Sequence, residues 1–383
     1  MHFFYKVTHF SLYAMTIFDY LLHLPTDSYI MPFEMDCVIF DLQEVNSVTI
    51  YDIAQEAGVS ASTVSRVLNG KKGVSADTRL KIESLLQKYD FEPNASAQGL
   101  VSQSSKLVGI IMSDIRTPHH AEGAYYIEQQ LSENGYSCII VNSGFSDQSR
   151  ENGIRLLAAR RPDAVVLIGS TFQNENIKRS IHKYLRNLPV IIENGFIDLP
   201  NVYSVLADEQ NGIAECLRLL YRKGRKSPCY ATMTDTPSNR LKISGFEQAW
   251  LEHNHDRQRG DVPVYRFDRR QGEEEWTTCY HATRTLIQSH PEIDSIIFCT
   301  DLFANAGVRA LSDLGIDIPG QVAVIGVDNS IYATLCRPQL TTLDNKMPEL
   351  SVACSNNLIQ LLKHEKVSRR MMILSDIIER ETT

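Results

Sequence analysis

At 383 residues the chain is longer than one ordinary domain, so two or three domains are expected. Its 43% hydrophobic and 22% charged residues predict a sizeable buried core, and its formal net charge of −8 argues against non-specific adhesion to nucleic acid. None of the eight cysteines forms a CxxC pair, which argues against a zinc knuckle or a dithiol redox site and indicates reduced thiols in a cytoplasmic protein.

Residues 1–47 form an aromatic and apolar segment that begins MHFFYKVTHFSLYAMTIFDYLLHLP. His, Lys and Asp interrupt it, so no stretch approaches the roughly 20 apolar residues of a membrane span. It also lacks the basic start and small-residue cleavage site of a secretory signal. Two interpretations remain: an appended or wrongly annotated start, with the true protein beginning near Val45, or a functional extension. The first is favoured.

The stretch VTIYDIAQEAGVSASTVSRVLNG, residues 48–70, predicts two short helices joined by a tight turn. Thr49 with Asp52 is typical of a helix N-terminus, and apolar residues follow at helical spacing. Gly58 supplies the left-handed conformation that ends the first helix, and Ser60 caps the second. The buried face of the second helix is expected to consist of Val64, Val67 and Leu68.

A third amphipathic helix is expected in SADTRLKIESLLQKYDF, residues 75–91. Its Leu80, Ile82, Leu85 and Leu86 are predicted to complete a small core with the first two helices. Two helices across a short turn with glycine indicate a helix-turn-helix, although a generic helical hairpin remains an alternative.

These residues carry a resemblance to a known family. Residues 48–100, including VSADTRLKIESLLQKYDFEPNASAQGL after the first stretch, resemble the LacI/GalR family of bacterial transcriptional regulators in order and spacing. The similarity continues more diffusely to about Arg380. The resemblance implies a DNA-binding domain over residues 48–92, a hinge over 93–106 and an effector-binding and dimerisation module of two lobes over 107–383.

The resemblance implies that the second helix lies in the major groove. Ala61 and Ser62, just after the Ser60 cap, would be the variable base readers. Arg66 would pair with guanine, and such a pair contributes roughly 1–3 kcal/mol of discrimination. Phosphate contacts are expected from Thr49, Tyr51, Thr63, Ser65 and Asn69. For Thr63 and Ser65 the alternative is ordinary helix surface.

The charge of the DNA-binding segment is weak. Residues 48–106 contain seven Lys or Arg and six Asp or Glu, a net charge of +1. Because non-specific affinity comes from phosphate neutralisation, one such segment should bind DNA poorly by itself. Two copies on a symmetric homodimer would supply affinity through effective concentration, on a palindromic operator in double-stranded DNA.

The linker EPNASAQGLVSQSSK separates this segment from the rest of the chain. Pro93 ends the third helix near Glu92, and residues 94–101 are too short to be helical alone. The resemblance implies a hinge helix here, beginning at Asn94, that orders on the operator, with Leu100 wedged into the minor groove. A plain flexible linker is the alternative.

From Leu107 onward, apolar runs alternate with amphipathic stretches. The runs are LVGIIM, SCIIV, DAVVLIG, LPVIIEN, CYATM, VPVYRF, SIIFCTD and VAVIGVD. Continuously apolar strands that alternate with helices predict doubly wound parallel sheets covered on both faces. Two groups of strands indicate two lobes. The stretch LTTLDNKMPELSVACSNNLIQLLKH, followed by MMILSDIIER, is expected to return to both of them. The fold class is thus a small all-α head with an α/β module that resembles periplasmic binding proteins, with a ligand cleft between its lobes.

The stretch SNRLKISGF contains the first candidate effector-binding residue. The family shows an arginine three residues before the glycine of a GF pair; here Gly245 and Phe246 are present, but Lys242 takes the arginine's place. Lysine offers a point charge rather than a planar fork, so a carboxylate clamp is in doubt and a sugar or sugar phosphate is the expected ligand. Arg240 is a candidate to compensate.

Three further candidates follow predicted strands. By resemblance, Asp301 in CTDLFA is a ligand-binding aspartate whose acceptors suit vicinal hydroxyls, and Asp328 in GVDNS is a crossover aspartate. His119, with His120, lies in the loop after the first strand, near the expected cleft mouth. A helix cap or a surface charge is the alternative for each, and it is favoured for Asp328 and the histidines.

The chain shows no GxGxxG after its first strand, no GxxxxGK[ST], no HExxH and no GxSxG. We therefore expect no catalytic residues, no cofactor and no metal. The prediction is a transcriptional regulator, most simply a repressor, whose operator affinity is controlled by a small carbohydrate-like ligand. A solute-binding protein without a regulatory role, or an enzyme on an α/β scaffold, would be the alternatives.

Overall fold

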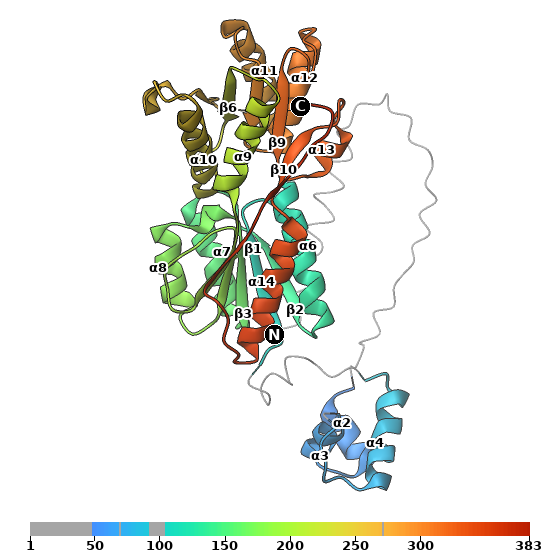
Figure 1. The fold of residues 1–383 in the computed structure, drawn as a ribbon. Helices are drawn as coiled ribbons and strands as arrows, with labels where there is room; N and C mark the ends of the chain where they lie inside the picture. Colours follow the sequence, from blue (N-terminus) through green and yellow to red (C-terminus); the bar gives the residue numbers. More distant parts are fainter. Residues whose placement is uncertain (1–47, 69, 92–103, 270–271) are drawn as a thin grey trace, which may run out of the picture. The chain divides into compact units, whose positions relative to one another are not determined.

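The computed structural model describes residues 48–68, 70–91, 104–269 and 272–383. It divides into two compact units, Met1–Glu92 and Pro93–Thr383 (Figure 1). The predictions for residues 1–47, Asn69, Asn94, Leu100 and most of the hinge lie outside the described residues. Within the described ranges, no helix combines the length and the apolar character that a membrane crossing requires.

The described part of the first unit folds into three short helices. They are α2 (Ile50–Ala57), α3 (Ala61–Leu68) and α4 (Ala76–Lys88) (Figure 1). Their facing sides enclose a small core in which Ile53, Val64 and Ile82 are fully buried. This arrangement of α2, a tight turn and α3, supported by a third helix, is the predicted helix-turn-helix.

Both predicted ends of α2 are confirmed. The Thr49 hydroxyl accepts a hydrogen bond from the backbone N–H of Asp52 at 3.4 Å, and the Asp52 carboxylate accepts one from the backbone N–H of Thr49 at 2.8 Å. This reciprocal pair is a capping box. Gly58 ends the helix with a φ of 71°, a left-handed conformation that glycine adopts without strain. The two ends fix the turn that leads into α3.

One core prediction in this unit is wrong. Leu80 was expected to pack inside, but 66% of it is exposed. Ile82 and Leu85 are buried and Leu86 packs against them. Leu80 precedes Ile82 by two residues, which is about 200° of rotation on a helix, so the two side chains point to opposite sides of α4.

The second unit contains two α/β lobes. Lobe 1 has a parallel six-stranded sheet of order β11-β5-β4-β3-β1-β2. Its strands are β1 (Leu107–Met112), β2 (Ser137–Asn142), β3 (Ala164–Ile168), β4 (Val190–Glu193), β5 (Val202–Ala207) and β11 (Arg370–Ile373). One face is covered by α6 (Pro118–Glu133) and α14 (Met347–Leu362), the other by α7 (Asp147–Ala159) and α8 (Glu175–Tyr184). A short 3₁₀ turn, η1 (Ser170–Phe172), follows β3.

Lobe 2 has a six-stranded sheet of order β12-β10-β9-β8-β6-β7. Its strands are β6 (Pro228–Thr232), β7 (Val264–Arg266), β8 (Ser295–Phe298), β9 (Ala323–Val327), β10 (Thr341–Asp344) and β12 (Asp376–Ile378). Its helical segments are α9 (Glu209–Arg222), α10 (Pro237–His253), η2 (Arg259–Asp261), α11 (Glu275–Ser289), α12 (Asp301–Asp313) and α13 (Ile331–Leu335). α9 packs against α10, and α11 packs against α12.

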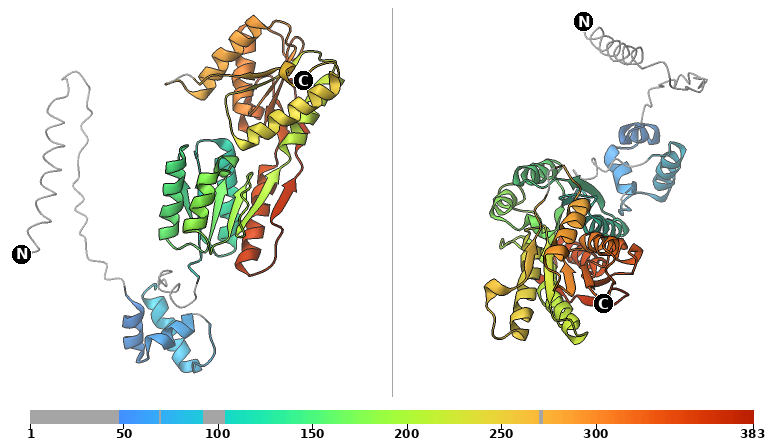
Figure 2. Two further views of the ribbon diagram at one scale, coloured as in Figure 1. Left: turned by 90° about the vertical axis from the view of Figure 1, so that its left-hand side faces the viewer. Right: turned by 90° about the horizontal axis from the view of Figure 1, so that it is seen from above.

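The chain passes between the lobes three times: between β5 and α9, between β10 and α14, and between β11 and β12. As a result α14 and β11, late in the sequence, lie with the early strands of lobe 1, where they are drawn in red beside green elements (Figure 2). The predicted return of the C-terminal segment to both lobes is confirmed.

The structure also corrects the strand predictions. β5 was not expected, because Tyr203 and Ser204 interrupt the apolar run in VYSVLA. β12 pairs with β10 in the antiparallel direction, so the second sheet is not wholly parallel as expected. The chain enters β12 directly from the neighbouring lobe, without the crossover helix that parallel pairing requires.

Candidate DNA-binding surface and effector site

The exposed face of α3 carries the candidate base readers. Val64 and Val67 are buried in the core of the first unit, whereas Ser62 and Arg66, four residues apart, share the exposed face. Ala61 is half-buried at the first position of the helix. A short side chain and a long cation on one exposed helical face match what base-edge contacts in a major groove require.

Ser60 begins α3 as predicted. Its hydroxyl accepts a hydrogen bond from the backbone N–H of Thr63 at 3.3 Å. The same oxygen lies 2.8 Å from the Ser62 hydroxyl and 2.9 Å from that of Thr63. These three hydroxyls therefore gather at the N-terminus of α3, where backbone N–H groups and the helix dipole favour an anion such as a phosphate.

The other residues of the first unit differ in how exposed their side chains are and in whether their polar groups already have partners within the protein. Tyr51 is 73% exposed on α2. Thr49 is exposed, but its hydroxyl already serves the capping box. Ser65 is half-buried. Lys88 is exposed and pairs with Glu56 at 2.8 Å, which lowers the number of cations available to DNA. The surface thus has the limited charge that the sequence predicted.

In the second unit, the carboxyl ends of the strands in both sheets indicate the position of a candidate ligand site. Strand order reverses between β1 and β3 in lobe 1 and between β6 and β8 in lobe 2. Ligands of open α/β sheets bind at such switch points, beyond the strand ends. Ser113 and Ser170 follow the two strands of lobe 1, and Asp301 follows β8.

Lys242 is buried beside a carboxylate that the sequence did not single out. Its ammonium lies 3.3 Å from Oε1 of Glu209 and donates to the carbonyl oxygen of Cys299 at 3.2 Å. Only 7% and 2% of the Lys242 and Glu209 side chains are exposed. Burial opposes the charge, but the carboxylates of Glu209 and Asp328 outweigh it and hold the pKa of Lys242 above its usual value. The ammonium is therefore protonated, and the Glu209 carboxylate beside it already balances its positive charge.

Ser238 connects this ion pair to lobe 1. Its hydroxyl donates to Oε1 of Glu209 at 2.8 Å, and its backbone N–H donates to the Ser170 hydroxyl at 3.1 Å. Nδ1 of His119 on α6 lies 4.0 Å from Oδ1 of Asp328, which follows β9. We call Ser170, His119, Glu209, Ser238, Lys242 and Asp328 the interlobe cluster, because its contacts join lobe 1 to lobe 2.

The histidines of the interlobe region are neutral at pH 7. Burial lowers the pKa of His119, against the raising effect of Asp328. Burial, helped by His119, also lowers the pKa of His120 to about 4. Nδ1 of His120 lies 3.0 Å from the carbonyl oxygen of Asp114, which orients the ring. His119 therefore meets Asp328 as a polar group and not as a cation.

Asp301 is held by protein donors. Its Oδ2 accepts from the backbone N–H of Ser330 at 2.6 Å and from its hydroxyl at 3.0 Å, and its Oδ1 accepts from the Thr342 hydroxyl at 2.6 Å. Burial, with Asp328 nearby, raises its pKa to about 7. The acceptors that were expected to bind ligand hydroxyls instead tie the end of β8 to the loop after β9 and to β10.

Asp328 occupies an unusual backbone position. Its φ is 104°, in the left-handed region that non-glycine residues rarely adopt, and such strain clusters at functional sites. Its side chain accepts a hydrogen bond from Nδ2 of Asn345 at 3.2 Å, at the second crossing between the lobes. Asn345 in turn accepts from the Ser375 hydroxyl at the third crossing, at 3.0 Å. Asp328 thus links the interlobe cluster to two of the crossings.

Arg240 does not join the interlobe cluster. More than half of its side chain is exposed, and its guanidinium pairs with Asp235 at 2.8 Å. The residue beside it, Asn239, is buried and donates to Thr232 and Thr234 while it accepts from the hydroxyl of Tyr230 at 2.8 Å. Arg240 is thus not placed to compensate for the lysine at position 242, as had been expected. The charge beside Lys242 is instead the carboxylate of Glu209.

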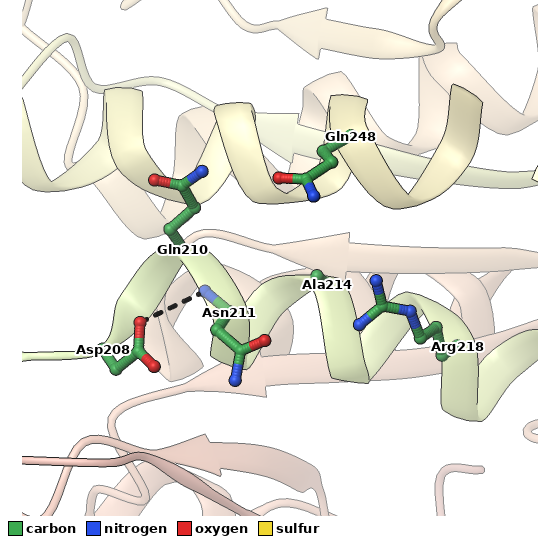
Figure 3. A pocket seen from close by; sticks show the side chains of 6 residues that line it. All are labelled: Asp208, Gln210, Asn211, Ala214, Arg218 and Gln248. Atoms are coloured by element: carbon green, nitrogen blue, oxygen red, sulfur yellow. Dashed lines mark hydrogen bonds between the residues drawn. The ribbon is translucent and has the colours of Figure 1, made fainter. Parts of the chain in front are cut away.

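A small hollow lies along α9 and α10 (Figure 3). Its volume is about 140 Å³, below the roughly 300 Å³ of typical ligand pockets. It is lined by Asp208, Gln210, Asn211, Ala214, Arg218 and Gln248. None of the predicted effector residues lines it. Within the described ranges, no group of three or more His, Cys, Asp or Glu side chains is placed to hold a metal ion.

Sequence reasoning missed Glu209, Ser238 and Ser170. Glu209 is the first residue of α9 and lies two residues after the end of β5, the strand that was not predicted. A strand that ends in Ala-Asp-Glu before an amphipathic helix was the available signal, since binding residues cluster at such strand ends. Ser238 stands four residues before Lys242, on the same face of α10, and was overlooked because serine carries no charge.

Family profiles match nearly all of the described chain. Residues 49–94 match the profile described as bacterial regulatory proteins, lacI family. Residues 105–381 match that of the periplasmic binding proteins and sugar binding domain of the LacI family.

Relatives match over the same extent. An HTH-type transcriptional regulator of Lachnoclostridium phytofermentans is 30% identical over 336 residues, covering 87% of this chain and 99% of the relative. Catabolite control protein A of Priestia megaterium is 27% identical over 338 residues, covering 87% and 98%.

Solved structures have the same fold. The lac repressor dimer bound to operator and the anti-inducer ONPF superposes with a TM-score of 0.76 at 22% identity, covering 88% of this chain and 98% of that one. The complex of the transcriptional regulator CelR with cellobiose gives 0.63 at 21% identity, covering 88% and 100%. The chain belongs to the LacI family of DNA-binding transcriptional regulators, a non-enzymatic family with a helix-turn-helix and an effector-binding domain like the periplasmic binding proteins.

Proposed function

We propose that the protein is a repressor that binds a palindromic operator as a homodimer and changes its affinity when a carbohydrate-like ligand binds between its lobes. The observation that carries the ligand part is the interlobe cluster, in which buried and half-buried polar side chains of both lobes meet at the carboxyl ends of the two sheets. A ligand held there contacts both lobes, so its binding free energy depends on the angle between them.

On the DNA, Ala61 and Ser62 read base edges and Arg66 pairs with guanine. Thr49, Tyr51, Thr63, Ser65 and Asn69 contact phosphates, and residues 93–106 form the hinge, with Asn94 at its start and Leu100 in the minor groove. The exposed face of α3 and the three hydroxyls at its N-terminus support this assignment. The protein acts in the cytoplasm, where the operator is.

An apolar surface on lobe 1 supports the homodimer. Ile115, Tyr125, Ile140 and Phe145 are large apolar side chains of lobe 1 that are all exposed, and a surface that carries several such side chains is a candidate interaction site. Ile140 lies on β2, the edge strand of the sheet, and Tyr125 lies on α6, which packs beside it. This surface, the lobe-1 patch, is proposed to pack against the same surface of a second copy.

The decisive test is DNA binding with and without candidate ligands. Full-length protein is used to select duplexes from a random library, and the selected site is then titrated in a mobility-shift assay. We expect a palindromic site bound by two copies, and a change in affinity of about 5- to 150-fold with an effective sugar, the usual range of allosteric coupling. Failure to retain any duplex would contradict the proposal.

A further inference from the structure

We propose that the effector is an uncharged, polyhydroxylated molecule, and that the Glu209–Lys242 pair selects it against phosphorylated and carboxylated sugars. This inference rests on the proposed function, because it names the chemical class of the ligand of the interlobe cluster. It departs from what the sequence left open, since Lys242 alone was compatible with a sugar phosphate.

The first support is the charge of the region. Three cations near the ends of the sheets already have carboxylate partners: Lys242 pairs with Glu209 at 3.3 Å, Arg116 with Asp114 at 2.7 Å and Arg150 with Asp147 at 3.2 Å. Asp328 adds a further carboxylate. An arriving phosphate would have to compete with a buried carboxylate for its cation, at the cost of leaving that carboxylate unpaired.

The second support is the set of unused hydrogen-bonding groups. The Lys242 ammonium has three donors, of which two are used, by Glu209 Oε1 and by the carbonyl oxygen of Cys299. Oε2 of Glu209 is buried and has no hydrogen-bond partner among the described residues. One spare donor therefore lies beside one spare acceptor.

A hydroxyl group satisfies both members of such a pair, because it accepts one hydrogen bond and donates another. A fully ionised phosphate or a carboxylate only accepts, so it would leave Oε2 of Glu209 unsatisfied and add repulsion. Ser238 and Ser170, whose hydroxyls lie on either side of the lobe junction, extend the same preference for neutral polar groups.

The test compares matched pairs of ligands on the full-length protein at pH 7.5 in a buffer without phosphate. Glucose is paired with glucose 6-phosphate and with glucuronate, galactose with galactose 6-phosphate and with galacturonate, and cellobiose with cellobionate. Thermal shift gives a first ranking and calorimetric titration gives the dissociation constants. We expect at least one neutral sugar to bind and its charged counterparts to bind at least about tenfold more weakly.

The variant Glu209→Gln keeps the size of the side chain and removes its charge. We expect it to weaken binding of the neutral sugar about tenfold, the usual effect of losing a hydrogen bond to a charged group, and to reduce the discrimination against the phosphate. Glu215→Gln, which removes an exposed carboxylate of the same helix that pairs with Arg218, should leave both affinities unchanged.

A second variant covers the case in which Glu209→Gln fails to fold because Lys242 is left unpaired. The double variant Glu209→Gln with Lys242→Met removes both charges and should fold, bind neutral sugar weakly and gain no affinity for the phosphate. Equal affinity of the wild type for a sugar and its phosphate would overturn the inference while leaving a ligand-controlled regulator intact. Operator binding without affinity for either class of sugar would remove the carbohydrate part of the proposed function, and the inference with it.

Discussion

Glu193 is a glutamate whose buried surroundings favour the neutral form of its side chain. It ends β4, is fully buried, and accepts one hydrogen bond, from the Ser351 hydroxyl to Oε1 at 2.6 Å. Its Oε2 has no partner among the described residues and lies so close to Gly123 that a Cβ there would approach it to 2.6 Å. Burial raises the pKa of Glu193 to about 7. The folded protein therefore favours the protonated acid.

This pKa predicts a specific dependence of stability on pH. Because the folded pKa is raised, the contribution of Glu193 is fully present below about pH 4.5 and is lost as pH rises through about 7. Between pH 6 and pH 8 the loss is about 1 kcal/mol. We expect Glu193→Gln to remove this part of the trend in the free energy of unfolding, measured by urea titration at both pH values.

The control for Glu193→Gln is Glu133→Gln, which changes an exposed carboxylate at the end of α6. Asp301, whose pKa burial also raises to about 7, keeps its own contribution in every variant. If wild type and Glu193→Gln lost stability in parallel between the two pH values, the assignment to Glu193 would be wrong.

Arg66 carries a prediction about sequence selectivity. It is exposed on α3, on the face that also carries Ser62. Arg66→Ala should relax selectivity at one base pair of each half-site and weaken binding there by roughly 1–3 kcal/mol. The measurement is a titration of single-base operator variants. Lys81→Ala, an exposed cation of α4, should weaken all sites alike if it has any effect, and the same uniform loss for Arg66→Ala would contradict base reading.

At the scale of elements, the close packing of α9 on α10 positions the Glu209–Lys242 pair. A Cβ on Gly245 would lie 1.9 Å from the carbonyl oxygen of Gln210, so the two helices touch through backbone at this point. Phe246, next to it, is fully buried in the core of lobe 2. The GF pair noticed in the sequence thus has a packing reason, since only glycine permits this approach.

Gly245→Ala should therefore force the helices apart. Because Glu209 and Lys242 lie on these two helices close to the contact, their separation should grow and sugar binding should be lost, with a destabilisation of about 1–3 kcal/mol. Gly260→Ala, where a Cβ would meet nothing within 4 Å, is the matched control. Calorimetric titration and thermal unfolding of both variants check this. Normal affinity in Gly245→Ala would mean that the helix contact does not position the pair.

The same elements show what the sequence could predict. The helix-turn-helix, its caps at Thr49 and Gly58 and eight apolar strands follow from local patterns, which are visible within a few residues. β5 was not predicted because Tyr203 and Ser204 interrupt its apolar run, and β5 ends two residues before Glu209. The pairing of Glu209 with Lys242 could not be predicted, because it joins two helices 33 positions apart and depends on their packing.

At the scale of the whole molecule, the lobe-1 patch determines the oligomeric state in our proposal. Ile140→Asp places a charge on the exposed edge strand β2 and should dissociate the dimer, with a loss of operator affinity of about 100-fold or more as the two heads become independent. Sedimentation equilibrium and mobility shift measure the two effects. Leu156→Asp, on α7 over the opposite face of the sheet, should change neither. A dimeric Ile140→Asp protein would refute this surface.

The three crossings between the lobes have a consequence for synthesis on the ribosome. β11 and β12 are made after the other described strands, and each takes an edge position in a different sheet. The buried side chain of Thr382, which follows them, donates to the carbonyl oxygen of Val324 at 2.7 Å. Until these residues leave the exit tunnel, both sheets lack a strand, although the helix-turn-helix was completed long before. A nascent chain can thus carry a folded helix-turn-helix attached to two lobes that are not yet fully folded. Translation that stops early should yield fragments for proteolysis, not a constitutive repressor.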